Sequence, residues 1–213
     1  PVNTANVAIK AGTSSVAPIQ LTSGTNLTTA AAGAIEYDGK VGYFTGESSQ
    51  RGVIQSTQFL RLASAYTTPG TSTALQNLFN SPTNGAITVA GSTTYQFECG
   101  FALTAMSSTS GNFSFGFGGT ATYSSVFYNG VAAKGNATQT NVGTGTTANI
   151  LTANNVNTTG VANIRGMIVI GTGGTIIPQF ATSVAAAAVV TAGSYFTLTA
   201  LGSNTTNTVG NWS

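Results

Sequence analysis

The sequence has no histidine, one cysteine and very few charged residues. Charged side chains make up 5% of its 213 residues, against about 25% in ordinary globular domains. Without histidine, the chain lacks the commonest general base and metal ligand. Cys99 alone forms neither an intrachain disulfide nor a multi-cysteine metal site, and hard metal ions need clustered carboxylates. We therefore expect no catalytic site, no metal site and no cofactor, and we expect the chain not to be an enzyme.

Positive charge and long apolar runs are also scarce. The formal net charge is +2 and is spread thinly along the chain. This is too little positive charge to attract nucleic acid or an anionic membrane. No segment resembles a signal peptide. The longest small apolar run, Val184 to Val190, is far shorter than the roughly 18 residues that a membrane span needs. We expect no nucleic-acid partner and no membrane insertion.

The residues that are abundant are small, polar and uncharged. The chain solvates itself with Ser, Thr, Asn and Gly, yet it is 41% hydrophobic and has 11 Phe and 7 Tyr. Disorder requires low hydrophobicity and high net charge, so it does not fit the chain as a whole. A surface of hydroxyls and amides suits a protein that is locked into an assembly.

From residue 86 onward, apolar residues recur at every second position, which indicates β-strands. The clearest strand runs from Tyr95 to Leu103, with Cys99 on its apolar face as a buried, inert thiol. A second strand covers Phe113 to Gly118, and others are expected at 123–128, 164–170, 175–180 and 195–201. Turn signals stand at 118–119, 129–130, 173–174 and 192–193. This pattern predicts an all-β fold, an antiparallel β-sandwich or jelly roll.

The first 58 residues have a different pattern, with short apolar patches between Gly, Ser and Thr. They are too sparse for a compact core, so we expect an extended N-terminal arm over residues 1–58 that pairs with neighbouring subunits, followed by a β-sandwich domain over residues 59–213. Within the arm, Ala34 to Thr45 predicts a β-hairpin in which Asp38 and Gly39 form a type I′ turn.

One short helix is predicted at residues 73–79. Leu75, Leu78 and Phe79 share one helical face there. Ser72 or Thr71 is placed to cap the helix, and Pro82 follows its end.

The acidic residues allow two interpretations each. Glu36 and Asp38 point to the same face of a strand, which suits a glycosidase pair, but we favour solvated hairpin charges beside Lys40. Glu98 either faces solvent opposite the Phe row or pairs with a base such as Arg165 at a subunit contact. The weakest functional alternative is a glycan depolymerase that uses the four acids, which are Glu36, Asp38, Glu47 and Glu98.

Several motifs, in order, resemble a family of structural proteins of tailed-phage virions. They are residues 17–24 (APIQLTSG), 32–39 (AGAIEYDG), 50–54 (QRGVI), 59–62 (FLRL), 95–98 (YQFE), 115–122 (FGFGGTAT), 175–179 (TIIPQ), 192–196 (AGSYF) and 209–213 (VGNWS). The resemblance covers residues 16 to 213. In that family, often from cyanobacterial phages, such segments form the C-terminal ends of tail fibres or of other virion proteins.

The resemblance implies a position on the outer surface of the virion, attachment to other virion proteins and a homotrimer, and it supplies no catalytic residues. This chain departs from the family in having no long fibre shaft. Pro1 fits a start after a removed initiator Met and also a start inside a longer chain.

Two functions from different classes follow. The favoured one is a tail-fibre adhesin that binds a polysaccharide or protein on the host surface. The alternative is a capsid decoration (cement) protein that stabilises the head, for which an N-terminal arm suited to strand exchange is the motivating feature.

Overall fold

The computed structural model describes residues 9–69, 73–108, 112–135, 137–143, 145–151 and 157–212, without the side chains of 137–142 and 148–151. The chain forms two compact units, each described by itself below. The small unit comprises Pro1–Ile54 and Val209–Ser213, and the large unit comprises Gln55–Thr208.

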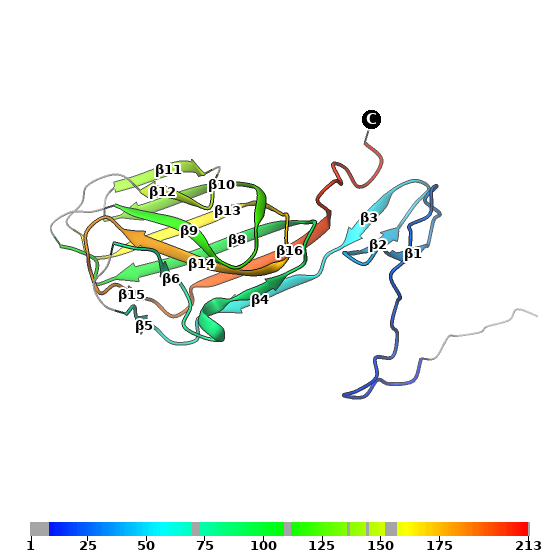
Figure 1. The fold of residues 1–213 in the computed structure, drawn as a ribbon, viewed down its shortest axis with the longest axis horizontal. Helices are drawn as coiled ribbons and strands as arrows, with labels where there is room; N and C mark the ends of the chain where they lie inside the picture. Colours follow the sequence, from blue (N-terminus) through cyan, green and yellow to red (C-terminus); the bar gives the residue numbers. More distant parts are fainter. Residues whose placement is uncertain are drawn as a thin grey trace, which may run out of the picture. The chain divides into compact units, whose positions relative to one another are not determined.

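The large unit is a β-sandwich of two antiparallel sheets (Figure 1). The first sheet contains β4 (Thr57–Arg61), β5 (Tyr66–Thr67), β8 (Thr93–Thr104), β10 (Tyr123–Lys134), β11 (Ala137–Gly143), β13 (Gly160–Ile170), β15 (Val189–Val190) and β16 (Tyr195–Ser203). Its strands follow the order β11, β10, β13, β8. Beyond β8 the sheet divides: β16 pairs with one part of β8 and is followed by β4, whereas β15 pairs with the other part and is followed by β5. The second sheet contains β6 (Gln76–Asn77), β7 (Ile87–Val89), β9 (Phe113–Gly119), β12 (Thr147–Leu151) and β14 (Gly174–Thr182).

An aromatic core joins the two sheets. Phe97 of β8 lies 5.1 Å from Phe117 and 6.2 Å from Phe115 between ring centroids, and both partners belong to β9 of the other sheet. Phe97 also contacts Phe196 of β16 at 5.9 Å and Tyr128 of β10 at 6.2 Å. The predicted alternation is confirmed, because every second residue of β8 from Tyr95 to Leu103 is at most 5% exposed.

Each of the strands predicted after residue 90 is present, and several are longer than expected. The turn predicted at Asn129 and Gly130 is wrong, because β10 runs through both residues to Lys134. Gly130 pairs with Ile164 of β13 on one side and with Asn141 of β11 on the other. Pairing on both sides stabilises the extended backbone more than an Asn-Gly pair favours a turn.

The helix predicted at residues 73–79 is also wrong. The described part of this segment, from Thr73 onward, contains the short strand β6, which pairs with Gln179 and Phe180 of β14. A seven-residue helix is marginal because helix nucleation is costly. Pairing with a sheet edge also buries both Leu78 and Phe79 completely. Among the described residues, the helical element is a 3-10 turn at Thr83–Gly85.

The small unit contains a three-stranded antiparallel sheet of β1 (Ile35–Tyr37), β2 (Gly42–Thr45) and β3 (Arg51–Ile54). The predicted hairpin is confirmed as β1 and β2, in which Tyr37 pairs with Gly42. Its turn is not type I′, since a positive φ occurs at Gly39 (87°) and not at Asp38. A four-residue connection is formed instead, and the Asp38 carboxylate accepts hydrogen bonds from the backbone N–H groups of Lys40 and Val41.

The segment before β1 contains no strand or helix over its described residues, 9–34. Its apolar side chains are exposed, from 47% at Leu21 to 65% at Val16. The boundary between the units follows Ile54, and residues 209–213 belong to the small unit. Pairing of this segment with other subunits stays a prediction. In the described part of the chain, no helix is long and apolar enough to cross a membrane.

Candidate functional site

The outer face of the eight-stranded sheet carries two cross-strand rows of side chains. The register opposes Asn129 of β10 to Arg165 of β13, and Arg165 to Glu98 of β8. The next row runs from Val131 through Asn163 to Gly100 and reaches Tyr195 of β16. These residues point outward because their neighbours along each strand point into the core.

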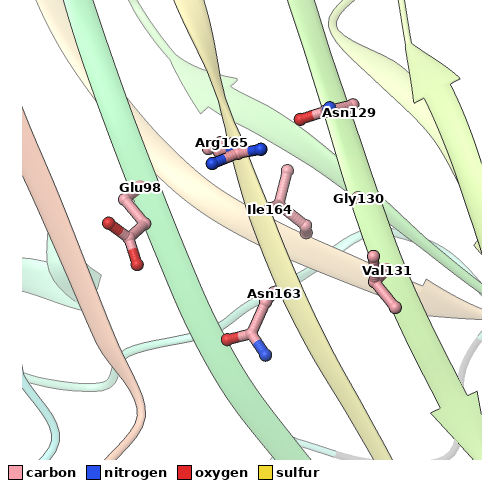
Figure 2. A pocket seen from close by; sticks show the side chains of 7 residues that line it. All are labelled: Glu98, Asn129, Gly130, Val131, Asn163, Ile164 and Arg165. Atoms are coloured by element: carbon pink, nitrogen blue, oxygen red, sulfur yellow. The ribbon is translucent and has the colours of Figure 1, made fainter.

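A shallow hollow of about 260 Å³ lies on this face. Figure 2 shows its lining along three adjacent strands, with Glu98 on β8, Arg165 and Asn163 on β13, and Asn129 and Val131 on β10. We call this the sheet hollow. It is completed by Gly130 and Ile164.

Glu98 faces solvent, as one of its two interpretations predicted, and it is held by a tyrosine. The Tyr195 hydroxyl donates a hydrogen bond of 2.5 Å to Glu98 Oε1. This bond to the carboxylate, together with burial, raises the pKa of Tyr195 to about 12. Arg165 is the direct cross-strand neighbour of Glu98, yet the two form no ion pair within 4 Å. Figure 2 shows the carboxylate on the side of β8 that faces away from Arg165.

Three polar side chains of the sheet hollow have no partner among the residues that the structure describes. Among the described residues, no hydrogen bond or ion pair involves the side chains of Asn129, Asn163 or Arg165. Arginine offers five donors and each amide offers both donors and acceptors. The sheet hollow therefore presents hydrogen-bonding groups that only water or a ligand satisfies.

A glycine brings two of these residues together. A Cβ atom at Gly100 would lie 2.5 Å from Tyr195 Cε1 and 3.1 Å from Asn163 Oδ1. The absence of a side chain at Gly100 thus lets the half-buried Tyr195 ring lie over the backbone of β8, next to the amide of Asn163. This use of glycine for a close approach is typical of strand positions.

The other acids serve the small unit as structural groups. Arg51 Nε lies 2.8 Å from Glu36 Oε2, and the Glu36 side chain is 9% exposed. Glu36 Oε1 also accepts a hydrogen bond of 2.6 Å from the Leu27 N–H, and Arg51 Nη2 donates to the Leu27 carbonyl at 2.7 Å. The prediction of a solvated charge beside Lys40 is wrong for Glu36, because Arg51 and the backbone of Leu27 occupy its carboxylate.

Asp38 is likewise engaged. Burial raises the pKa of Asp38, but the N–H groups of Val41 and Lys40 and the Tyr43 hydroxyl hydrogen-bond the ionised form, and the net result is a lowered pKa. The Tyr43 hydroxyl donates to Asp38 Oδ2 at 2.8 Å. Glu47, by contrast, is exposed. Glu36 and Asp38 are therefore occupied by structural contacts, and Glu98 belongs to the other unit.

Cys99 lies where the pattern predicted. It is fully buried, and burial raises the pKa of its thiol. A thiol with a raised pKa is a weak nucleophile. In the part of the chain that the structure describes, no group of three or more His, Cys, Asp or Glu residues could hold a metal ion.

Two other hollows have weaker claims. One of about 570 Å³ is lined by residues such as Tyr66, Asn77 and Asn84. Residues 70–72, which include both predicted helix caps, lie outside the described residues. The other, of about 370 Å³, surrounds Trp212 in the small unit. Trp212 is 77% exposed, and its indole N–H donates to the Val209 carbonyl.

Solvent exposure of Glu98 was one of the two interpretations that the sequence allowed, and the sequence did not identify a site around it. Asn129, Asn163 and Tyr195 were not singled out, and Arg165 entered as a pairing base. The available signal is the alternation itself, which places Asn163 and Arg165 on the face opposite Ile164.

Comparisons with known proteins are sparse. No model of a protein family matches the sequence, and no curated protein matches it. Among solved structures, the chain is similar to a protein in the "Structure of infectious bursal disease virus Gx strain", with 10% sequence identity and a TM-score of 0.22. The similarity covers 82% of this chain and 42% of that one, so this chain spans less than half the length of that protein. A likeness of this size carries no conclusion about the role of the chain.

Proposed function

We propose that this chain is a non-enzymatic structural protein on the outer surface of a phage virion, and that it acts there as a tail-fibre adhesin for the host surface. The observation that carries the adhesin function is the sheet hollow, where the hydrogen-bonding groups of Arg165, Asn163 and Asn129 have no partner within the described part of the chain. Exposed polar groups that converge on a hollow are the usual features of a binding site. The resemblance of the ordered motifs to tailed-phage virion proteins supports the virion location.

Immunogold labelling of virions tests the location. Label at the tail or fibre tips is the expected result. In a second assay, the purified chain is added to host cells before the phage, and reduced adsorption of the phage is expected. A chain that neither binds host cells nor competes with the phage would refute the adhesin.

A capsid decoration protein is the second candidate. It is favoured by the segment before β1, whose exposed apolar side chains, such as Val16 and Ile19, suit a clamp on neighbouring subunits. This function predicts label over the head, copy numbers that match capsid symmetry sites, and heads that leak DNA when the protein is absent. Copies confined to the tail would end it.

Under either function, we propose a homotrimer. The edge strand β4 has few charges to protect it, and its Phe59 is 64% exposed. Association covers such edges. Sedimentation equilibrium over a range of concentrations tests this, and a monomer at every concentration contradicts it.

A further inference from the structure

We propose that the sheet hollow binds one uncharged sugar unit of a surface polysaccharide, and that the Tyr195 ring, which lies over Gly100 at the margin of the lining residues, extends the contact surface. Asn163, Arg165 and Glu98 are the groups that hydrogen-bond the sugar hydroxyls. This inference names the ligand class of the proposed adhesin and rests on that function.

The size of the sheet hollow fits a small ring. Its volume of about 260 Å³ is below the roughly 300–1,000 Å³ of pockets that enclose drug-sized ligands. It is also shallow, since it lies on a sheet face between outward side chains of β8, β10 and β13. A single sugar ring within a longer chain enters such a depression edge-on or flat, while the rest of the polysaccharide extends over the sheet.

The polar groups match hydroxyls better than they match an anion. A sugar hydroxyl donates and accepts at the same time, so a pair of neighbouring hydroxyls needs both kinds of partner. Arg165 supplies donors, Glu98 Oε2 supplies an acceptor, and Asn163 supplies one of each. The opposite charges of Glu98 and Arg165 leave the site with no net charge, so it lacks the excess of positive charge that selects phosphate or carboxylate ligands.

Tyr195 supplies an apolar surface beside these groups. Its ring lies over Gly100, next to Asn163 Oδ1, and its hydroxyl is fixed by Glu98. A tyrosine held in this way offers rigid contact area at a low cost in conformational entropy. The C–H face of a pyranose packs on such a ring while the hydroxyls at its edge reach the amide and the charged groups.

The same face also bears Phe127 and Met167, which are 53% and 44% exposed and face each other across β10 and β13. They would suit an interface between copies of the chain. The sheet hollow argues for the sugar instead. A protein partner would have to match each of these polar groups or leave it desolvated, which costs free energy. A sugar supplies hydroxyls to them and stays hydrated on its outer side.

The test is a titration of the isotope-labelled full chain with the methyl glycosides of glucose, galactose, mannose and rhamnose, followed by NMR. Methyl glucuronide is the acidic comparison. We expect at least one neutral glycoside to shift the side-chain amide signals of Asn129 and Asn163 in a saturable way. A dissociation constant on the order of millimolar is expected for one sugar on an open site, equivalent to about −4 kcal/mol.

Matched variants locate the site. Asn163→Ala and Arg165→Ala are expected to weaken binding at least tenfold. Asn207→Ala and Lys10→Ala, which remove an amide and a positive charge from exposed positions that do not line the sheet hollow, are expected to leave it unchanged. Gly100→Ala removes no polar group but places a Cβ 2.5 Å from the Tyr195 ring. It is expected to weaken binding as much as Asn163→Ala, with the circular dichroism spectrum unchanged.

Three results overturn the inference. The first is the absence of any saturable shift with a neutral glycoside up to about 100 mM, well above a millimolar Kd. The second is an equal loss of glycoside affinity in the site variants and in their controls. The third is tighter binding of the glucuronide than of the neutral glycosides. Dissociation of an oligomer by Arg165→Ala would assign the face to contact between copies instead. Competition by the purified chain for phage adsorption, with no glycoside binding here, leaves the adhesin standing and removes this site alone. Glycoside binding without competition for phage adsorption would leave this site standing and refute the adhesin.

Discussion

Replacing Phe97 by alanine is expected to lower the free energy of unfolding of the large unit substantially. Phe97 is 1% exposed, and its ring contacts four other aromatic rings that belong to three strands and to both sheets. A buried Phe→Ala change costs about 3–5 kcal/mol, depending on how far the cavity collapses. Here the rings around the cavity are anchored in paired strands, so little collapse is possible and the upper half of that range is expected.

The expected loss is large against a typical domain stability of about 5–15 kcal/mol. A loss of about 4–5 kcal/mol corresponds to a fall of roughly 8–20 °C in Tm for a unit of this size. Five of the seven tyrosines belong to the large unit, whereas Trp212 belongs to the small one. Unfolding of the large unit is therefore followed by tyrosine near-ultraviolet circular dichroism, not by tryptophan fluorescence.

Phe127→Ala is the matched control, since it makes the same chemical change on the outer face of β10, where Phe127 is 53% exposed. It is expected to change the free energy of unfolding by no more than about 0.5 kcal/mol. A loss below about 1.5 kcal/mol for Phe97→Ala, or equal losses for the two variants, would refute the reasoning that the aromatic cluster joins the sheets.

Three further predictions concern individual charged groups. Glu36→Gln weakens the contacts to Arg51 and to the Leu27 N–H. Hydrogen exchange of the Leu27 amide is therefore expected to accelerate roughly tenfold, which corresponds to a loss of about 1.4 kcal/mol. The control Glu47→Gln changes an exposed acid and is expected to leave this exchange rate unchanged. The pKa of Asp38 is lowered from 3.8, so its stabilising effect is complete above that pH and is lost as the pH falls through the lowered pKa. Asp38→Asn is expected to reduce the loss of small-unit stability at acid pH, with unfolding followed by Trp212 fluorescence. An unchanged loss of stability at acid pH contradicts this. Because the pKa of Tyr195 is raised from 10.0 to about 12, its effect is present below pH 10 and is lost as the pH rises toward 12. Glu98→Gln is expected to return one tyrosine to a pKa nearer 10 in an absorbance titration, and a titration identical to that of the wild type counts against the hydrogen bond.

The buried half of the sandwich could be predicted from the sequence because burial of apolar side chains is local and non-directional. The alternation of Tyr95 to Leu103 places the core residues of β8 whatever strand lies beside it. Features that depend on distant partners could not be predicted in this way. A strand pair on each side overrides the turn signal at Asn129, and a sheet edge at β14 overrides the helical spacing of residues 73–79.

Lys134 shows the same limit for a charged residue. It ends β10 with a fully buried side chain, its ammonium lies 3.4 Å from the Ser107 carbonyl, and burial lowers its pKa. Lysine is almost never fully buried, and no pattern in the sequence around Lys134 predicts its burial. Its burial follows from tertiary contacts that no local pattern contains.

The sheet hollow depends both on local alternation within each strand and on contacts between distant strands. Its residues come from strands far apart in the sequence, so no spacing motif links Glu98 and Gly100 to Asn163 and Tyr195. Yet the core fixes their positions, because a slip of one residue would turn every side chain of a strand to the opposite face. Inward placement of Phe97 and Phe101 in β8 therefore forces Glu98 and Gly100 outward, and burial of Ile164 in β13 does the same for Asn163 and Arg165. The strand register that packs the aromatic core therefore also aligns the outward residues of the sheet hollow. The fold tolerates substitution of the polar residues of the sheet hollow, but it does not tolerate substitution of the core residues that align them.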